Sequence, residues 1–265
     1  MISMKSSLLI IVPTLNSYQL LPHLVTSLQA QSWTRWKLIF VDGPSDLEHR
    51  QWLESCCAAE PRCCWLEQDP VEPGIFGAMN QGFDQAAQDD WILFWGSDDW
   101  AAGPKVLEEA MSCIGTAPFQ SDLVVCRGRY VNASTGVLAR PSVFHSKGLL
   151  TAAAYRRAMW CGATPPHQAT LIGPGARRRL SRYAAGFRLS ADLDYFLRLS
   201  RFVDLRVHCL DLELVHMADA GISGQQTQRR LQEVRRAYQR SFGLGWYFPF
   251  IARYIGRLAS LVRLT

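Results

Sequence analysis

The chain has 265 residues, of which 48% are hydrophobic and 19% are charged, and its formal net charge is +5. This is a globular composition with enough apolar residues for a sizeable core, in one large domain or one domain with an appendage. No stretch reaches the ~18 to 20 uninterrupted apolar residues of a membrane-spanning helix, which excludes a membrane-spanning transporter or channel.

The first apolar segment, "SSLLIIVP" at residues 6–13, is short and runs into Pro13 without a small-residue cleavage site. These features predict a strand rather than a signal peptide, and we therefore expect a cytosolic protein.

Apolar strands alternate with helical segments over the first hundred residues. Strands are predicted at 8–16, 36–46, 63–69 and 90–100, with helices at 19–31, 47–60 and within 74–88. This alternation indicates an α/β fold with a parallel sheet that has helices on its faces.

Polar residues follow three of these strands at Thr14–Asn16, Asp42 and Asp98–Asp99. Because ligands bind beyond the carboxyl ends of the strands in such sheets, we expect the three clusters to meet in one crevice.

The second half is less regular. Strands at 122–131 and 137–140 are expected to pair around the turn at 132–136, and 167–173 reads as another strand. Residues 191–201 have helical spacing, and 205–217 reads as a pair of strands.

Asp98 and Asp99 in "FWGSDDW" are adjacent carboxylates after an apolar run. A divalent cation held together with a diphosphate would offset their repulsion, but a strand-ending turn or a helix N-cap also favours aspartate. Asp42 in "VDGPSD" has the same two readings, as an acceptor for a nucleobase N–H or as a turn residue.

The ordered motifs of the chain resemble those of family 2 glycosyltransferases with the GT-A fold, in which a Rossmann-like, mostly parallel sheet lies between helices. The resemblance covers roughly residues 7–225 and is closest to bacterial enzymes that build surface polysaccharides. The motifs are "VPTLN", "VDGPSD", "GIFGAMNQG", "WGSDD", "HQATL", "ADLDYFLRL" and "GIS".

The resemblance implies roles for individual residues. Asp192 would be the catalytic base of an inverting reaction, Asp99 would ligate Mg or Mn, and Asp98 would contact the ribose or the metal. The residues expected to contact the nucleotide are Pro13, Thr14, Asn16, Asp42, Asn80 and Asp98.

Two positions depart from the family pattern. Phe76-Gly77 stands where relatives often have Tyr-Asp, so the resemblance does not predict which sugar is transferred. Ala191 stands where many relatives have Glu before the base, so Asp194 is a second candidate for that role. Asp192 could instead cap the helix that follows it.

Two histidines are further candidates. His167 could donate a hydrogen bond to a phosphate or an acceptor, or it could be a core histidine. His216 loosely fits a third metal ligand of some GT-A enzymes. The cysteine doublets at 56–57 and 63–64 lack the spacing of a zinc site, which favours packing.

The C-terminal segment from residue 229 holds eight arginines and one glutamate. Within it, aromatic and aliphatic residues alternate with arginines over 246–264, as in a helix at a membrane surface. The alternative is a helix that docks on the protein's own core. We therefore divide the chain into a catalytic domain, 1–225, and a basic amphipathic tail, 226–265.

These observations together predict a transferase that moves one sugar from a nucleotide-diphosphate donor, such as a UDP-sugar, to a glycan or polyprenyl-diphosphate-linked acceptor. It would lie on the inner face of the membrane and bind no nucleic acid, because the basic charge is confined to a hydrophobic tail. The rivals are a non-catalytic nucleotide-sugar-binding partner and a sugar-1-phosphate nucleotidyltransferase, whose Gly-rich basic loop is missing from "VPTLNSYQL".

Overall fold

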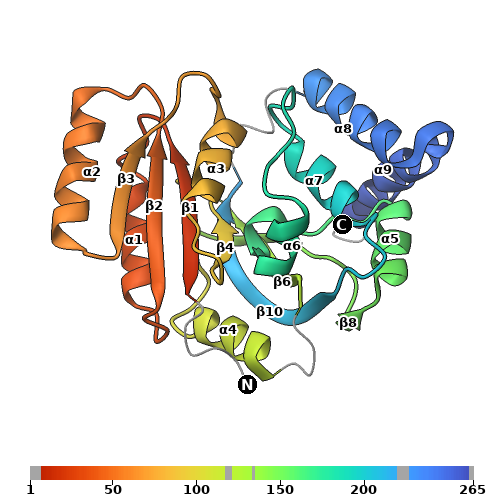
Figure 1. Ribbon diagram of the computed structural model, residues 1–265, viewed down its shortest axis with the longest axis horizontal. Helices are drawn as coiled ribbons and strands as arrows, with labels where there is room; N and C mark the ends of the chain where they lie inside the picture. Colours follow the sequence, from red (N-terminus) through yellow and green to blue (C-terminus); the bar gives the residue numbers. More distant parts are fainter. Residues whose placement is uncertain (1–6, 117–120, 133–134, 220–226, 263–265) are drawn as a thin grey trace.

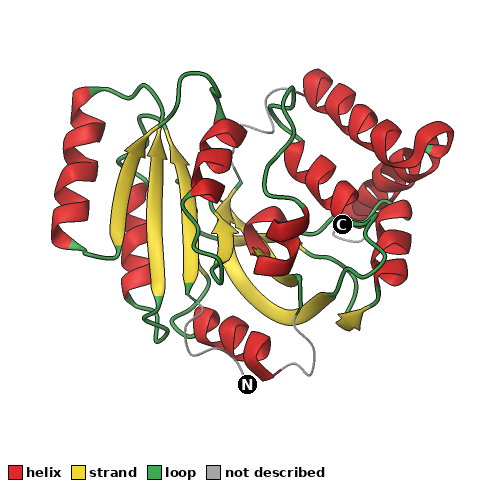
Figure 2. Cartoon of the chain, viewed as in Figure 1, coloured by secondary structure: helices red, strands yellow, loops and turns green. Residues whose placement is uncertain are grey.

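The computed structural model describes residues 7–116, 121–132, 135–219 and 227–262. One mixed sheet crosses the molecule, with helices on both of its faces (Figures 1 and 2). The strands are β1 (Leu8–Thr14), β2 (Trp36–Asp42), β3 (Cys63–Glu67), β4 (Trp91–Phe94), β5 (Asp99–Ala101), β6 (Leu123–Val131), β7 (Leu138–Ser142), β8 (Gly148–Leu150), β9 (Thr170–Ile172) and β10 (Val207–Ala218).

The helices alternate with the strands in the first half and gather at the C-terminal end in the second. They are α1 (Leu21–Gln29), α2 (Leu47–Ala59), α3 (Ile75–Asp84), α4 (Val106–Thr116), α5 (Ala152–Trp160), α6 (Pro174–Arg179), α7 (Ala191–Leu199), α8 (Thr227–Phe242) and α9 (Tyr247–Val262), with short 3-10 turns at His167–Ala169 and Gly243–Gly245.

The strand order is β3-β2-β1-β4-β9-β6-β10-β5. The expected parallel arrangement holds for β3, β2, β1 and β4, whereas β9 and β5 run antiparallel to their neighbours. The α/β fold is confirmed, and its sheet is parallel in the first half and mixed in the second.

The expected strand pair at 205–217 is wrong. These residues form one long strand, β10, which has register shifts between Cys209 and Val215 where it follows β6. A strand with bulges shows the same broken alternation in sequence as two short strands, because each extra residue moves the following side chains to the other face.

The sheet separates two apolar cores. Along β1, Leu9 and Ile11 face the core shared with α3, α5, α7 and α8, while Leu8, Ile10 and Val12 face α1, α2 and α4. This alternation follows from the two-residue period of a strand. It explains why a strand buried on both faces reads as a continuous apolar run.

The eight cysteines are free thiols, and Cys63, Cys126 and Cys209 are buried in the cores. The apolar environment raises the pKa of the Cys209 thiol to about 11. These three side chains therefore behave as small hydrophobic residues.

The boundary that we expected at residues 225/226 stays a prediction, although α8 is no free appendage. Val234, Ala237 and Tyr238 of α8 are buried in the same core as α7, and the two helices lie side by side in Figure 1.

Candidate active site

The polar ends of β1, β2 and β4 meet at one edge of the sheet, as predicted. Thr14 Oγ1 donates a hydrogen bond to Asp42 Oδ1 at 2.8 Å, which joins the ends of β1 and β2. Ser17 Oγ lies 2.9 Å from Ser97 Oγ, which joins the loops after β1 and β4. The three clusters therefore belong to one site.

Asn16 holds the loops after β1 and β2 together. Its Oδ1 accepts a hydrogen bond from the backbone N–H of Asp46 at 2.8 Å, and its own N–H donates to Ser45 Oγ. Its φ of +49° lies in the left-handed region, which asparagine tolerates better than most residues. Pro13 precedes this loop, and its carbonyl accepts a hydrogen bond from Ser97 Oγ at 3.3 Å.

Asp42 is 1% exposed, and its two oxygens have different surroundings. Oδ1 accepts hydrogen bonds from Thr14 Oγ1 and Ser45 Oγ and lies 3.0 Å from His49 Nε2. Oδ2 is buried without a hydrogen-bond partner among the described residues. An unpaired buried acceptor is costly, so this oxygen is suited to an N–H group of a ligand.

Asp98 and Asp99 converge beside Gly96. A Cβ placed on Gly96 would lie 2.7 Å from Asp98 Oδ1 and 3.3 Å from Asp99 Oδ2, so the space between the carboxylates exists because residue 96 is glycine. The backbone N–H of Gly96 donates a hydrogen bond to Asp99 Oδ2. Asp99 therefore also has the hydrogen bond expected of a turn aspartate.

The carboxylates of Asp98 and Asp99 have no cationic side chain to balance them in the part of the chain that the structure describes. Within the described residues no salt bridge involves either aspartate, and Asp99 is 2% exposed. Burial raises the pKa of both, and the charge of Asp98 raises that of Asp99 further, well above its usual range. Two neighbouring carboxylates, one buried and one partly buried, fit a hard divalent cation.

His216 contacts residues other than Asp98 and Asp99. Its Nε2 is 2.9 Å from Glu213 Oε1, and its ring contacts Trp100 edge-on. Among the described residues no group of three or more His, Cys, Asp or Glu side chains is arranged to hold a metal, so His216 does not join the two aspartates there. The "GIS" motif lies outside the described residues.

Asp192 and Asp194 differ in their surroundings although both lie in the first turn of α7. Asp194 is 1% exposed, 2.8 Å from Arg198 Nε and 3.0 Å from Arg240 Nη1, and so forms an ion-pair network between α7 and α8. Asp192 is partly exposed and belongs to none of the ion pairs between described residues. Of the two, Asp192 is the carboxylate that is open to a ligand.

His167 lies in an aromatic cluster near Asp192. Its Nε2 is 2.7 Å from Tyr183 Oη, and its ring stacks on Phe94 with centroids 5.5 Å apart. Burial lowers the pKa of His167, and the charge of Asp192 acts in the opposite direction. His167 is thus a histidine with a packed environment that lies within the electrostatic reach of Asp192.

Asn80 anchors this cluster. Its Oδ1 accepts from the backbone N–H of Tyr183 at 2.7 Å, and its Nδ2 donates to the Tyr183 carbonyl at 3.3 Å. Both ends of the amide are therefore occupied, and Asn80 fixes Tyr183, which in turn contacts His167. A direct contact of Asn80 with the nucleotide stays a prediction.

The departure at Phe76-Gly77 has a structural reason. A Cβ on Gly77 would lie 1.8 Å from the Glu72 carbonyl oxygen, so the aspartate of the relatives does not fit this backbone. Phe76 packs on Tyr183 with ring centroids 5.1 Å apart.

Sequence reasoning missed three residues of the site. His49 is fully buried beside Asp42, Tyr183 holds His167, and Glu233 accepts hydrogen bonds from three consecutive backbone N–H groups, those of residues 188–190, at 2.8–3.0 Å. Those residues lead directly into α7 and Asp192. The signal for Glu233 was present, because it is the single glutamate of an arginine-rich segment.

The comparison with known families decides the assignment, because residues 9–160 match the model described as glycosyl transferase family 2. The chain belongs to glycosyltransferase family 2. The protein is thus a transferase enzyme, and the nucleotidyltransferase reading is wrong.

A known protein of similar sequence agrees with this assignment, and solved structures share the fold. The "PGL/p-HBAD biosynthesis glycosyltransferase" of Mycobacterium tuberculosis is 29% identical over 189 residues, which are 71% of this chain and 68% of that protein. The crystal structure of S. aureus TarS 1-349 has a TM-score of 0.69 at 17% identity, covering 94% of this chain and 72% of that one. The mannosyltransferase PcManGT from Pyrobaculum calidifontis, in complex with GDP-Man and Mn2+, has a TM-score of 0.61 at 14% identity and covers 93% and 69%.

Proposed function

We propose that this glycosyltransferase is an inverting, metal-dependent enzyme that moves one sugar from a UDP-sugar to a hydroxyl of a glycan or lipid-linked acceptor in bacterial surface polysaccharide synthesis. The proposal rests chiefly on the convergence of Asp98 and Asp99 beside Gly96. Hydrogen bonds connect this turn to the loop after β1, and the end of β1 to the end of β2. Structures of similar fold are complexes with UDP, UDP-GlcNAc, or Mn2+ together with UDP or GDP-Man.

In this proposal the cation, Mn or Mg, would be held by Asp99 with Asp98, and when bound it would neutralise the charge of the leaving diphosphate. The chain's own residues do the rest. Asp98 contacts the ribose, and the loop from Pro13 to Asn16 positions the nucleotide. His167 and Asp194 are the candidates for contacts with phosphate or acceptor.

The state of Asp42 supports a uridine nucleotide. Three groups surround Oδ1, which leaves Oδ2 as a single buried acceptor. Uracil offers one ring N–H between two carbonyls, whereas guanine offers two neighbouring N–H donors that pair best with both oxygens of a carboxylate.

Asp192 acts as the general base. A sugar hydroxyl is a weak nucleophile at neutral pH, and a positioned carboxylate takes its proton as the hydroxyl attacks the anomeric carbon. The C1–oxygen bond to the diphosphate breaks as the new bond forms on the opposite face, so that one displacement inverts the anomeric centre. The hydrogen bonds from residues 188–190 to Glu233 hold the backbone before Asp192 in place.

The protein would lie at the membrane surface on the cytoplasmic side, and the exposed face of α9 supports contact with that surface. None of the helices in the described parts of the chain is both long and apolar enough to span a membrane. Within residues 247–255 of α9 the exposed large apolar residues are Tyr247, Phe248, Ile251 and Ile255, which repeat about every four residues along one side of the helix.

Calorimetric titration of UDP and GDP, with and without MnCl2, tests the proposal. We expect UDP to bind at least ten times more tightly than GDP, and Mn2+ to strengthen its binding. Equal affinity for both nucleotides would contradict the role of Asp42 in selecting uracil. UDP binding that is unchanged by Mn2+ would contradict the metal dependence. A panel of UDP-sugars in a UDP-release assay then identifies the sugar.

A further inference from the structure

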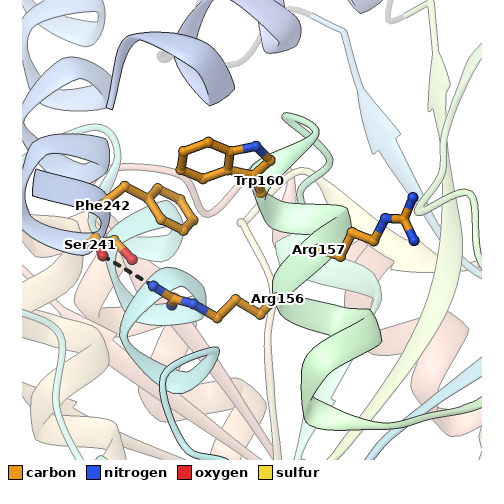
Figure 3. Close-up of a pocket in the computed structure, with 5 residues that line it drawn as sticks. All are labelled: Arg156, Arg157, Trp160, Ser241 and Phe242. Atoms are coloured by element: carbon orange, nitrogen blue, oxygen red, sulfur yellow. Dashed lines mark hydrogen bonds between the residues drawn. The ribbon is translucent and has the colours of Figure 1, made fainter. Parts of the chain in front are cut away.

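A cavity of about 520 Å³ lies between α5 and α8, away from the aspartates of the active site (Figure 3). Its lining combines arginines and aromatic rings, namely Arg156, Arg157, Trp160, Ser241 and Phe242. Figure 3 shows the Arg156 side chain running toward Ser241 below the Phe242 ring, while Arg157 extends away from them.

Arg156 carries a positive charge that no carboxylate balances within the described residues. Its Nη1 donates to Ser200 Oγ at 3.2 Å and its Nη2 to the Ser241 carbonyl at 3.3 Å, and both acceptors are neutral. A guanidinium has five N–H donors, so three remain. Burial lowers the pKa of Arg156, and the nearby charge of Arg201 lowers it further. The site is therefore positive and lacks an anion.

The walls of the cavity continue onto the exposed side of α9. Trp160 is 38% exposed and packs edge-on against Phe242 with centroids 4.9 Å apart. It also contacts Phe248 of α9, whose centroid lies 6.0 Å away and which is 54% exposed. An unbalanced cation thus lies beside an apolar surface that is open to solvent, and this pairing complements an anionic headgroup above acyl chains.

We propose that this cavity binds the phosphate of an anionic membrane lipid, with Arg156 as its ligand and Trp160 and Phe242 as its walls. The inference rests on the membrane association proposed above, and it adds a specific headgroup ligand, Arg156 of α5, which lies outside the C-terminal segment. Arg156 presents a planar fork of donors, which suits two phosphate oxygens better than a lysine would.

The test is sedimentation of the full chain with vesicles of phosphatidylcholine alone and of an equal mixture of phosphatidylcholine and phosphatidylglycerol. We expect the wild type to prefer the mixed vesicles. Arg156→Gln should weaken binding to them about tenfold or more. Arg157→Gln is the matched control, because it removes one exposed charge from the same helix and should cost about fivefold or less, the share of a single arginine near an anionic surface.

Arg156→Lys keeps the positive charge but removes the planar set of guanidinium donors, so it tests the two properties separately. It should bind the mixed vesicles less well than the wild type, and thermal unfolding of each variant shows that the fold is kept. Equal binding of Arg156→Lys and wild type, or equal losses in Arg156→Gln and Arg157→Gln, would overturn the headgroup site.

Two further results are distinguishable. If the wild type ignores both vesicle types, the membrane association itself fails, and the headgroup site fails with it. If inorganic phosphate raises the melting temperature of the wild type but not of Arg156→Gln, while vesicle binding is the same in both, the cavity holds a soluble phosphate and the lipid proposal is overturned.

Discussion

Asp98 and Asp99 approach each other because Gly96 has no side chain to keep them apart. Without a cation, the structure holds two neighbouring carboxylates, one of them buried, at a cost that shows in their raised pKa values. The two carboxylates therefore lower the stability of the metal-free protein, although they suit a bound cation. Replacing one of them should have opposite effects on stability and on metal-dependent binding.

Asp99→Asn should raise the melting temperature of the metal-free protein at neutral pH by about 2–4 °C, which corresponds to about 1 kcal/mol in a protein of this size. The reason is that the amide removes a buried charge and its repulsion with Asp98. The same variant should lose the strengthening of UDP binding by Mn2+. Differential scanning fluorimetry and calorimetry measure the two effects. A lower melting temperature together with unchanged Mn2+ dependence would show that Asp99 serves the turn alone.

The pH dependence of metal binding follows from the same two groups. Because the folded protein holds protons on Asp98 and Asp99 more tightly than the unfolded chain does, these carboxylates favour folding at low pH, and this contribution is lost as pH rises through their raised pKa values. Protons also compete with the cation. Mn2+ affinity should therefore fall on acidification already above the ordinary aspartate pKa near 4, as titrations between pH 5 and 8 would detect.

Asp192→Asn should lower the turnover number about 100-fold or more while UDP affinity with Mn2+ stays within twofold, because the base acts on the acceptor hydroxyl and not on the nucleotide. Asp194→Asn is the matched control, since it changes the same type of side chain two residues further along α7. We expect it to lower stability through its ion pairs with Arg198 and Arg240 and to keep most of the turnover. The reverse pattern in a UDP-release assay would move the base to Asp194.

At the scale of elements, α8 connects the C-terminal region to the active site. Its Glu233 is 6% exposed and accepts hydrogen bonds from the backbone that leads into α7. A carboxylate at the beginning of a helix satisfies N–H groups that have no partner within the helix. Ala191 offers no carboxylate of its own at this helix, and α8 brings one from more than forty residues away in the sequence.

Glu233→Ala should reduce turnover about tenfold or more with little change in UDP affinity, because the loop before Asp192 loses three hydrogen bonds. Val234→Ala, at the neighbouring buried position, should destabilise α8 by about 1–2 kcal/mol and leave turnover nearly unchanged. Hydrogen exchange at residues 188–190 should rise in Glu233→Ala alone. Similar turnover losses in both variants would reduce Glu233 to a stabilising residue, and Glu233→Gln should lie between Glu233→Ala and the wild type.

At the scale of the whole molecule, α9 both docks on the protein and presents an apolar face. Its docked side approaches so closely that a Cβ on Gly162 would lie 2.4 Å from the Arg253 backbone nitrogen, and Arg253 also hydrogen-bonds Thr164. The two readings of the tail, membrane surface or core docking, are therefore not exclusive, because docking uses one side of the helix and leaves apolar residues of the other exposed.

Ile251→Glu should reduce the fraction of protein that sediments with anionic vesicles about tenfold without lowering the melting temperature, because Ile251 is 51% exposed on the outer face of α9. Val203→Glu is the control, since Val203 is 93% exposed in the turn after α7. Deletion of residues 244–265 is a less selective test, as it also removes the contact of Phe248 with Trp160. Equal vesicle binding by the wild type, Ile251→Glu and Val203→Glu would leave docking on the core as the function of α9.

The sequence alone determined the first half of the fold and most of the candidate site. Strands β1, β2 and β4 are continuous apolar runs, and each is followed directly by its polar residues, so local pattern and position along the chain were sufficient. The site residues that sequence reasoning missed come from separate segments: His49 from a helix, Tyr183 from an irregular stretch and Glu233 from α8.

The tertiary structure alone decided three points. It distinguished Asp192 from Asp194, because the arginines that occupy Asp194 approach from α7 and α8 together. It assigned the bulged residues of 207–218 to one strand, since register depends on the neighbouring strand β6. It also divided α9 into a docked and an exposed side. In each case at least one deciding contact, such as that of Arg240 with Asp194, joins residues far apart in the chain, and amino-acid spacing carries no information about such contacts.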